Sequence, residues 1–311
     1  MTRNEFYYPS ADGKTKIHAV EWLPEGEPKA ILQIAHGVTE YILRYEEFAK
    51  FLTEKGIAVI GNDHIGHGTS IAEGAERMYF GPEGSWDWVV EDIKKCLEIT
   101  KNKFPNMPYC LLGFSLGSFL ARTYLTKYPG MLNGAIIMGS GQLPPFQISI
   151  AKFMVNNEAK KVGEDHTSPT IQKLSYETYN KYFAPNRTKY DWLCASTTSL
   201  DEYIKDTMRG EDFTAGLFRE LLNGMAFTAK QSNIEKIDKN MPILFLSGDK
   251  DPVGEQGKGV IKAYDCFKKA GIKDVNMKLY PGLRHDILRE DCRQDIFEDI
   301  YNWMKDKIIS E

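Results

Sequence analysis

Residues 109–117 read YCLLGFSLG, and this stretch decides how the rest of the chain is interpreted. Tyr109–Phe114 is a mostly apolar run, typical of a strand that is buried on both faces. It leads into Gly113-Phe114-Ser115-Leu116-Gly117, a G-x-S-x-G pattern at the start of a helical sequence. A tight strand-to-helix turn exposes a serine hydroxyl, and the flanking glycines relieve steric crowding. We therefore predict that Ser115 is a nucleophile; the alternative is a glycine-rich turn whose serine only caps the helix.

Short strand-like runs alternate with helical sequences around this motif. Two runs, Phe6–Tyr8 and Ile17–Trp22, predict an antiparallel opening hairpin. Five more predict further strands: Ala30–Ala35, Ile57–Gly61, Gly134–Met138, Pro242–Leu246 and Val275–Tyr280. Between strands, apolar residues recur with the spacing of an amphipathic helix, as at Tyr45, Phe48, Ala49 and Leu52. The alternation predicts an α/β protein with a mostly parallel eight-stranded sheet and helices on both faces.

The alternation stops after the sixth predicted strand. From Gln142 to about Lys236 there is no strand-like run, only helical and loop sequences with scattered aromatic residues. We therefore expect an α/β core formed by residues 1–141 and 236–311. Residues 142–235 would form a helical cap at the end of the sheet where Ser115 lies.

A serine nucleophile requires a base, and the base requires an acid that orients it. On a turn of this type the order along the chain is serine, acid, histidine. His285 lies in a loop after the last predicted strand, whereas His166 lies in a polar stretch of the insertion and is expected to be exposed. Asp249 and Asp251 both follow the seventh predicted strand, and either could be the acid.

An oxyanion hole needs two backbone N–H donors near the serine. Leu116 follows the serine at a helix start, and Val38 lies in the loop after the third predicted strand. His36 precedes the serine, which is the wrong order for the base, so we expect it to brace its own loop. In the turn from Asp63 to His67 the polar side chains can satisfy backbone groups, so we expect no metal site and no cofactor.

Composition and charge limit the possible partners. The chain has 311 residues and a net charge of −4, without the basic patch that nucleic acid or an anionic membrane surface would require. It has neither a signal-peptide pattern nor an apolar run long enough for a transmembrane helix. Its five cysteines are scattered and lack a metal or disulfide spacing, which predicts reduced, mostly buried thiols and a cytoplasmic location.

Together these residues resemble the monoacylglycerol lipase and bacterial lysophospholipase group of α/β-hydrolases, often described as serine aminopeptidases. The resemblance extends along nearly the whole chain, through HGVTEY (36–41), GNDHIGHGTS (61–70), GFSLGS (113–118), NRTKYDWL (186–193), GDKDP (248–252) and YPGLRH (280–285). It implies an α/β-hydrolase fold with Asp251 as the acid of the triad, and Val38 and Leu116 as the oxyanion hole.

The resemblance also implies hydrolysis of a small acyl ester such as a monoacylglycerol or a lysophospholipid. Two departures leave the substrate open: Phe114 and Leu116 flank the serine where the group often has His and Met, and Tyr41 stands where it often has His. A peptidase or amidase and an acyltransferase are alternatives that use the same triad. A non-catalytic binding protein is a further alternative, but it would usually have a broken triad.

Overall fold

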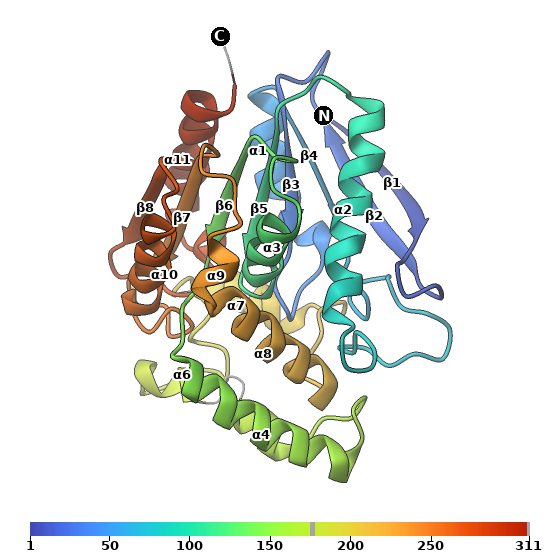
Figure 1. Ribbon diagram of the computed structural model, residues 1–311, viewed down its shortest axis with the longest axis vertical. Helices are drawn as coiled ribbons and strands as arrows, with labels where there is room; N and C mark the ends of the chain where they lie inside the picture. Colours follow the sequence, from blue (N-terminus) through green and yellow to red (C-terminus); the bar gives the residue numbers. More distant parts are fainter. Residues whose placement is uncertain (175–177, 310–311) are drawn as a thin grey trace.

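The computed structural model describes residues 1–174 and 178–309, and within these ranges eight strands form one sheet in the order β1-β2-β4-β3-β5-β6-β7-β8 (Figure 1). The strands are β1 (Thr2–Pro9), β2 (Lys16–Leu23), β3 (Ala30–Ala35), β4 (Ile57–Asn62), β5 (Tyr109–Phe114), β6 (Gly134–Met138), β7 (Ile243–Gly248) and β8 (Val275–Tyr280). β1 pairs antiparallel with β2, and β2 with β4, while all pairs from β4 to β8 are parallel. The predicted mostly parallel sheet is confirmed.

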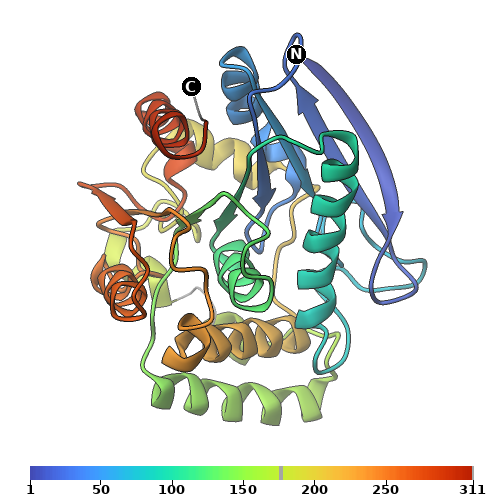
Figure 2. The same ribbon diagram turned by 45° about the horizontal axis from the view of Figure 1, so that its top comes forward.

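Helices cover both faces of this sheet, as predicted (Figure 2). On one face lie η1 (Ile42–Tyr45), α1 (Glu46–Glu54), η4 (Ile287–Arg289) and α11 (Arg293–Lys307); on the other lie α2 (Trp86–Lys103), α3 (Leu116–Lys127) and α10 (Lys258–Lys269). The apolar residues that predicted a helix after β3, among them Phe48 and Leu52, are buried on the α1 side of the sheet. Amphipathic spacing thus turns the apolar side of each helix toward the core.

The insertion between β6 and β7 is helical. Its elements are α4 (Pro145–Val162), α5 (Pro169–Gln172), α6 (Thr178–Asn180), η3 (Lys181–Phe183), α7 (Thr197–Lys205), α8 (Ala215–Ala229) and α9 (Gln231–Ile234). α8 packs against α2 and α3 of the core, and α4 packs along α8 (Figure 1). Ile148 and Val155 of α4 are buried, whereas Phe146 and Phe153 are exposed. Neither α4 nor any other helix in the described ranges combines the length and apolarity needed to cross a bilayer.

Arg122 of α3 joins both ends of the insertion to the core. Its guanidinium donates to the carbonyl of Gly141 (2.8 Å), where the chain leaves β6, and to the carbonyl of Thr228 (3.1 Å), near the end of α8. It also donates to the side chain of Gln142 (2.5 Å). Arg122 is buried, and no carboxylate of the described residues lies within ion-pair distance of it. Burial without a counter-charge lowers the pKa of Arg122 to about 10.

Candidate active site

Ser115 lies at the sharp turn between β5 and α3. Its backbone has φ 53° and ψ −117°, a left-handed conformation that a residue with a Cβ rarely adopts. The two flanking glycines make the turn possible. A Cβ on Gly117 would lie 1.9 Å from the carbonyl oxygen of Ala35, and one on Gly113 would lie 2.3 Å from the carbonyl oxygen of Gly117. The glycines predicted to relieve crowding therefore do so.

His285 and Asp251 complete a continuous chain of hydrogen bonds with Ser115. Nε2 of His285 is 2.8 Å from Oγ of Ser115, and Nδ1 of His285 is 2.9 Å from Oδ2 of Asp251. Asp251 and His285 are buried, while Ser115 is partly exposed. With its Nδ1 proton held by the carboxylate, the imidazole can accept the serine proton at Nε2. His166, in contrast, is exposed and pairs with Asp165, as the sequence predicted.

The two candidate acids have different partners. Besides His285, Asp251 accepts the N–H of Val253 (2.8 Å) and the hydroxyl of Ser247 (3.2 Å). Asp249 instead accepts the N–H of Gly282 (2.7 Å), so it braces the turn after β8. Of the two carboxylates, it is Asp251 that contacts the imidazole.

The two residues predicted for the oxyanion hole flank the serine. Leu116 is the first residue of α3, and the first N–H groups of a helix lack partners within it. Val38 lines the same pocket as Ser115, from the loop after β3. That loop is held by the buried carboxylate of Glu40, which accepts the N–H of Gly37 and the hydroxyl of Tyr45. Burial, together with nearby Asp286, raises the pKa of Glu40.

Three buried histidines lie close together, one at the start of this loop and two in the turn after β4. The rings of His36 and His64 have centroids 4.0 Å apart, and those of His36 and His67 are 5.4 Å apart. Nε2 of His36 accepts the N–H of His64 (3.0 Å), which confirms that His36 braces the loop. Burial lowers the pKa of all three imidazoles, those of His36 and His64 well below the usual value, and the rings repel one another when charged.

Around the polar turn after β4, the carboxylate of Asp63 satisfies backbone N–H groups, as predicted for the polar side chains of this turn. Asp63 accepts the N–H groups of Ile42 (2.8 Å) and Thr69 (3.0 Å), and its Oδ2 is 2.9 Å from Nδ1 of His18. Both carboxylate oxygens therefore already have partners. His67, at the end of the same turn, packs against Phe80. The side chains of this turn thus shape the loops around the site.

Part of the pocket wall comes from the insertion. Trp192, Leu193 and Tyr203 line the pocket together with Ser115 and His285. Its volume is about 20 Å³, room for about one water molecule, whereas sites for small ligands usually measure about 300–1,000 Å³. Sequence reasoning did not single out these three side chains. The available signal was the NRTKYDWL stretch, which ends on two of them.

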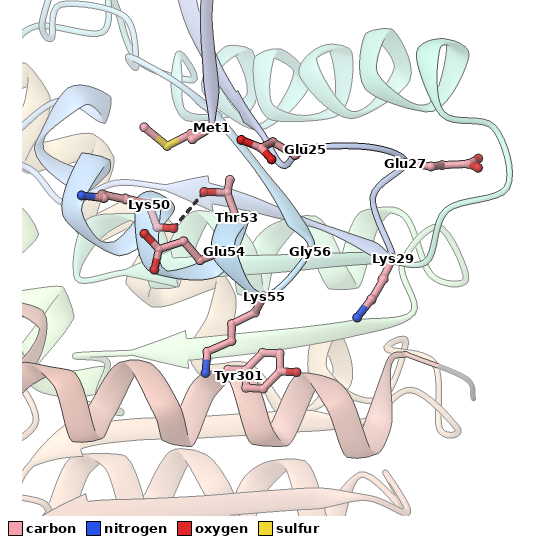
Figure 3. Close-up of a pocket in the computed structure, with 10 residues that line it drawn as sticks. All are labelled: Met1, Glu25, Glu27, Lys29, Lys50, Thr53, Glu54, Lys55, Gly56 and Tyr301. Carbon is pink, nitrogen blue, oxygen red and sulfur yellow. Dashed lines mark hydrogen bonds between the residues drawn. The ribbon is translucent and has the colours of Figure 1, made fainter.

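A larger open hollow lies elsewhere on the molecule (Figure 3). Lys29 and Gly56, which line it, immediately precede β3 and β4 and so lie at the amino ends of these strands. Ser115 follows the carboxyl end of β5, so it lies at the opposite end of these parallel strands. In the hollow, Nζ of Lys55 lies 5.2 Å from the ring centroid of Tyr301. This hollow is therefore separate from the site around Ser115.

Several known proteins are similar to this chain over most of its length. A monoacylglycerol lipase of Mycolicibacterium smegmatis is 24% identical over 97% of both chains. The monoglyceride lipase of Homo sapiens is 26% identical over 96% of this chain and 89% of its own. A thermostable carboxyl esterase of Bacillus coagulans, solved in complex with glycerol, superimposes with a TM-score of 0.91 at 26% identity, covering 99% of this chain and all of its own.

These similarities confirm the α/β-hydrolase fold and the resemblance noted from the sequence motifs. The chain also matches the family model described as serine aminopeptidase, S33 (Hydrolase_4), over residues 26–292. That range includes the turn at Ser115, the acid loop after β7 and His285. Because the match covers most of its length, this chain belongs to the serine aminopeptidase, S33 family of α/β-hydrolases.

Proposed function

We propose that this protein is a serine hydrolase that cleaves carboxylic esters, with monoacylglycerols as the first substrate class to test. The observation that carries the proposal is the hydrogen-bonded chain from Ser115 through His285 to Asp251, with links of 2.8 and 2.9 Å. The lipases and the esterase among its relatives support the choice of ester substrates. The unpaired thiols support the further proposal of a cytoplasmic location.

In the first half of the proposed reaction, Oγ of Ser115 attacks the ester carbonyl carbon while Nε2 of His285 takes the hydroxyl proton. The carbonyl oxygen becomes an oxyanion, which the N–H groups of Val38 and Leu116 stabilise. Asp251 holds the imidazole and stabilises its positive charge. The intermediate then collapses, the bond to the leaving alcohol breaks, and His285 returns the proton to that alcohol.

In the second half, water replaces the alcohol. His285 takes a proton from the water, the hydroxide attacks the acyl carbon, and a second oxyanion forms in the same place. Collapse of this intermediate releases the carboxylic acid and returns the proton to Ser115. Every proton moves between serine, imidazole, water and alcohol, so the cycle needs no cofactor or metal ion.

We propose that residues 142–235 act as a cap that covers the acyl site. Trp192, Leu193 and Tyr203 support this role because they line the pocket beside Ser115. Apolar side chains at this position would shield the bound acyl chain from bulk solvent. The pocket of about 20 Å³ is too small for an acyl chain, so binding of a lipid ester would require part of the cap to move.

Labelling of Ser115 tests the proposal directly. A fluorophosphonate probe should modify the wild-type protein at this residue, and Ser115→Ala should lose both labelling and ester hydrolysis while remaining folded. Loss of a triad member typically costs several orders of magnitude in turnover. Near wild-type hydrolysis of a p-nitrophenyl ester by Ser115→Ala would show that the nucleophile is another residue.

A substrate panel separates the alternatives that use the same triad. Matched ester and amide substrates, with and without an added alcohol acceptor, distinguish an esterase from a peptidase or an acyltransferase. Monoacylglycerols of increasing chain length then define the acyl preference. Faster cleavage of the amide than of its matched ester, or transfer to the alcohol in preference to water, would contradict the esterase assignment.

A further inference from the structure

We propose that Trp192 is a positioning residue for His285, held in place by a clamp between the insertion and the loop that carries the histidine. This inference rests on the proposed function, because it assigns to one residue of the insertion a role in orienting the base of the triad. The clamp consists of the insertion segment 190–195 and the loop segment 284–290.

The imidazole of His285 contacts two aromatic rings. The ring centroid of Phe114, which precedes the nucleophile, is 4.9 Å away, and that of Trp192 is 5.2 Å away. Their planes are inclined to the imidazole by 37° and 34°. Hydrogen bonds to Asp251 and Ser115 fix the two ring nitrogens, and the two aromatic rings limit tilting of the imidazole.

Trp192 is itself buried and supported from behind. It is 7% exposed, its ring centroid lies 5.3 Å from that of Tyr179, and its backbone N–H donates to the side chain of Asn180 (3.0 Å). Packing on several sides leaves a large ring few alternative positions. The tryptophan can therefore act as a rigid wall for the imidazole.

Hydrogen bonds to backbone carbonyls tie the clamp together on both sides of Trp192. The N–H of Asp286, next to the catalytic histidine, donates to the carbonyl of Leu193 (2.6 Å). The guanidinium of Arg284, on the other side of His285, donates to the carbonyls of Asp191 and Cys194 (3.2 Å to the latter). Both neighbours of the histidine are thus bonded to the segment that carries Trp192.

Glu290 closes the clamp. Its carboxylate accepts the N–H of Ala195 (2.9 Å) and that of Arg284 (3.1 Å), which links the end of the insertion segment to the start of the histidine loop. Glu290 is buried, and burial raises its pKa. Two backbone N–H groups on opposite sides of the clamp depend on this one carboxylate, so its loss should loosen the clamp.

Removal of the Trp192 ring should change the response of the enzyme to pH. Water that reaches the imidazole stabilises its charged form, so the acidic side of the activity profile should move to higher pH. The substitution leaves the other polar and titratable side chains around the imidazole unchanged. These are Asp251 against Nδ1, Ser115 against Nε2, Tyr179 behind Trp192, and Arg284, Asp286 and Glu40 on the adjoining loops.

The test compares Trp192→Leu, Trp192→Phe and Phe213→Leu with wild type. Phe213 is a matched control, because it is a buried aromatic residue of the insertion that packs on Phe218 and does not line the pocket. The substrate is p-nitrophenyl acetate, whose short acyl group makes few contacts with the cap. For Trp192→Leu we expect kcat to fall roughly 10- to 100-fold with little change in KM, since small misplacements of a catalytic group can cost this much.

The pH profile decides whether the effect acts through the histidine. In Trp192→Leu the half-activity pH on the acidic side should rise, Trp192→Phe should restore most of kcat and the wild-type profile, and Phe213→Leu should match wild type. A wild-type profile in Trp192→Leu, or the same change in Phe213→Leu, would overturn the proposal. Should Trp192→Leu fail to fold, Glu290→Gln carries the test, because it loosens the clamp that holds Trp192 while the indole side chain is kept. An unchanged profile there overturns the proposal as well.

Failure of the proposed function would be recognised separately. In that case Ser115→Ala would retain activity, whatever the Trp192 variants do. If Ser115→Ala is inactive and the Trp192 variants behave as wild type, the esterase assignment stands and the positioning role is wrong.

Discussion

Asparagine in place of Asp251 tests the acid of the proposed triad with almost no change in side-chain size. In the wild-type site, Oδ1 accepts the N–H of Val253 at 2.8 Å and Oδ2 lies 2.9 Å from Nδ1 of His285. An amide has one oxygen, and the Val253 N–H needs an acceptor, so the asparagine NH₂ group would face the imidazole. The ring would then accept at Nδ1 and carry its proton on Nε2, where it could not receive the proton of Ser115.

This change of tautomer sets the expected magnitude. A loss of about 10⁴-fold in kcat is typical when the orienting aspartate of a serine triad becomes asparagine. At about 1.36 kcal/mol per factor of ten, this is roughly 5.4 kcal/mol of lost transition-state stabilisation. The assay is hydrolysis of a p-nitrophenyl ester by purified, folded Asp251→Asn, with circular dichroism as the check on folding.

Asp249→Asn is the matched control. Asp249 accepts the N–H of Gly282 at 2.7 Å, and asparagine keeps an acceptor for that bond. We expect a change of about twofold or less, in line with other substitutions outside the core. A loss below about tenfold for Asp251→Asn, or a larger loss for Asp249→Asn, would refute the reasoning about the acid and its tautomer.

Two further predictions concern stability. Arg122→Met should lower the free energy of unfolding in urea by about 2–4 kcal/mol, because the buried carbonyls of Gly141 and Thr228 lose their donor; unchanged stability would mean that Arg122 does not fasten the insertion. The buried histidines His36, His64 and His67 have folded pKa values below the ordinary 6.5, so below that pH the unfolded chain binds more protons than the folded one. Each histidine should therefore lower the free energy of unfolding by up to about 1.4 kcal/mol per pH unit as the pH falls. In urea titrations at several pH values, His67→Gln should reduce the slope of unfolding free energy against pH by the contribution of one histidine. An equal slope in the variant would contradict the assignment.

The elements of the fold and the turn that carries the proposed nucleophile could be predicted from the sequence alone. Strand and helix spacing, and the glycines on either side of Ser115, depend on neighbours within a few residues, so they can be predicted from a single chain. All eight predicted strands occur, but β1 begins at Thr2, four residues before its predicted start at Phe6, and β7 extends two residues beyond its predicted end at Leu246. The place of His285 in the loop after the last predicted strand, and of His166 in a polar stretch of the insertion, also distinguished the two histidines.

Only the tertiary structure decided which side chains meet. Asp249 and Asp251 both follow β7, and the way the loop after β8 folds back brings His285 against one and Gly282 against the other. His285 is 34 residues from Asp251 and 170 residues from Ser115 along the chain. The contact of Trp192 with His285 likewise depends on the path of the insertion. Hydrogen bonds and ring contacts need atomic positions accurate to a few tenths of an ångström. Local sequence spacing does not describe how the intervening loops fold, so it cannot predict such contacts between residues far apart in the chain.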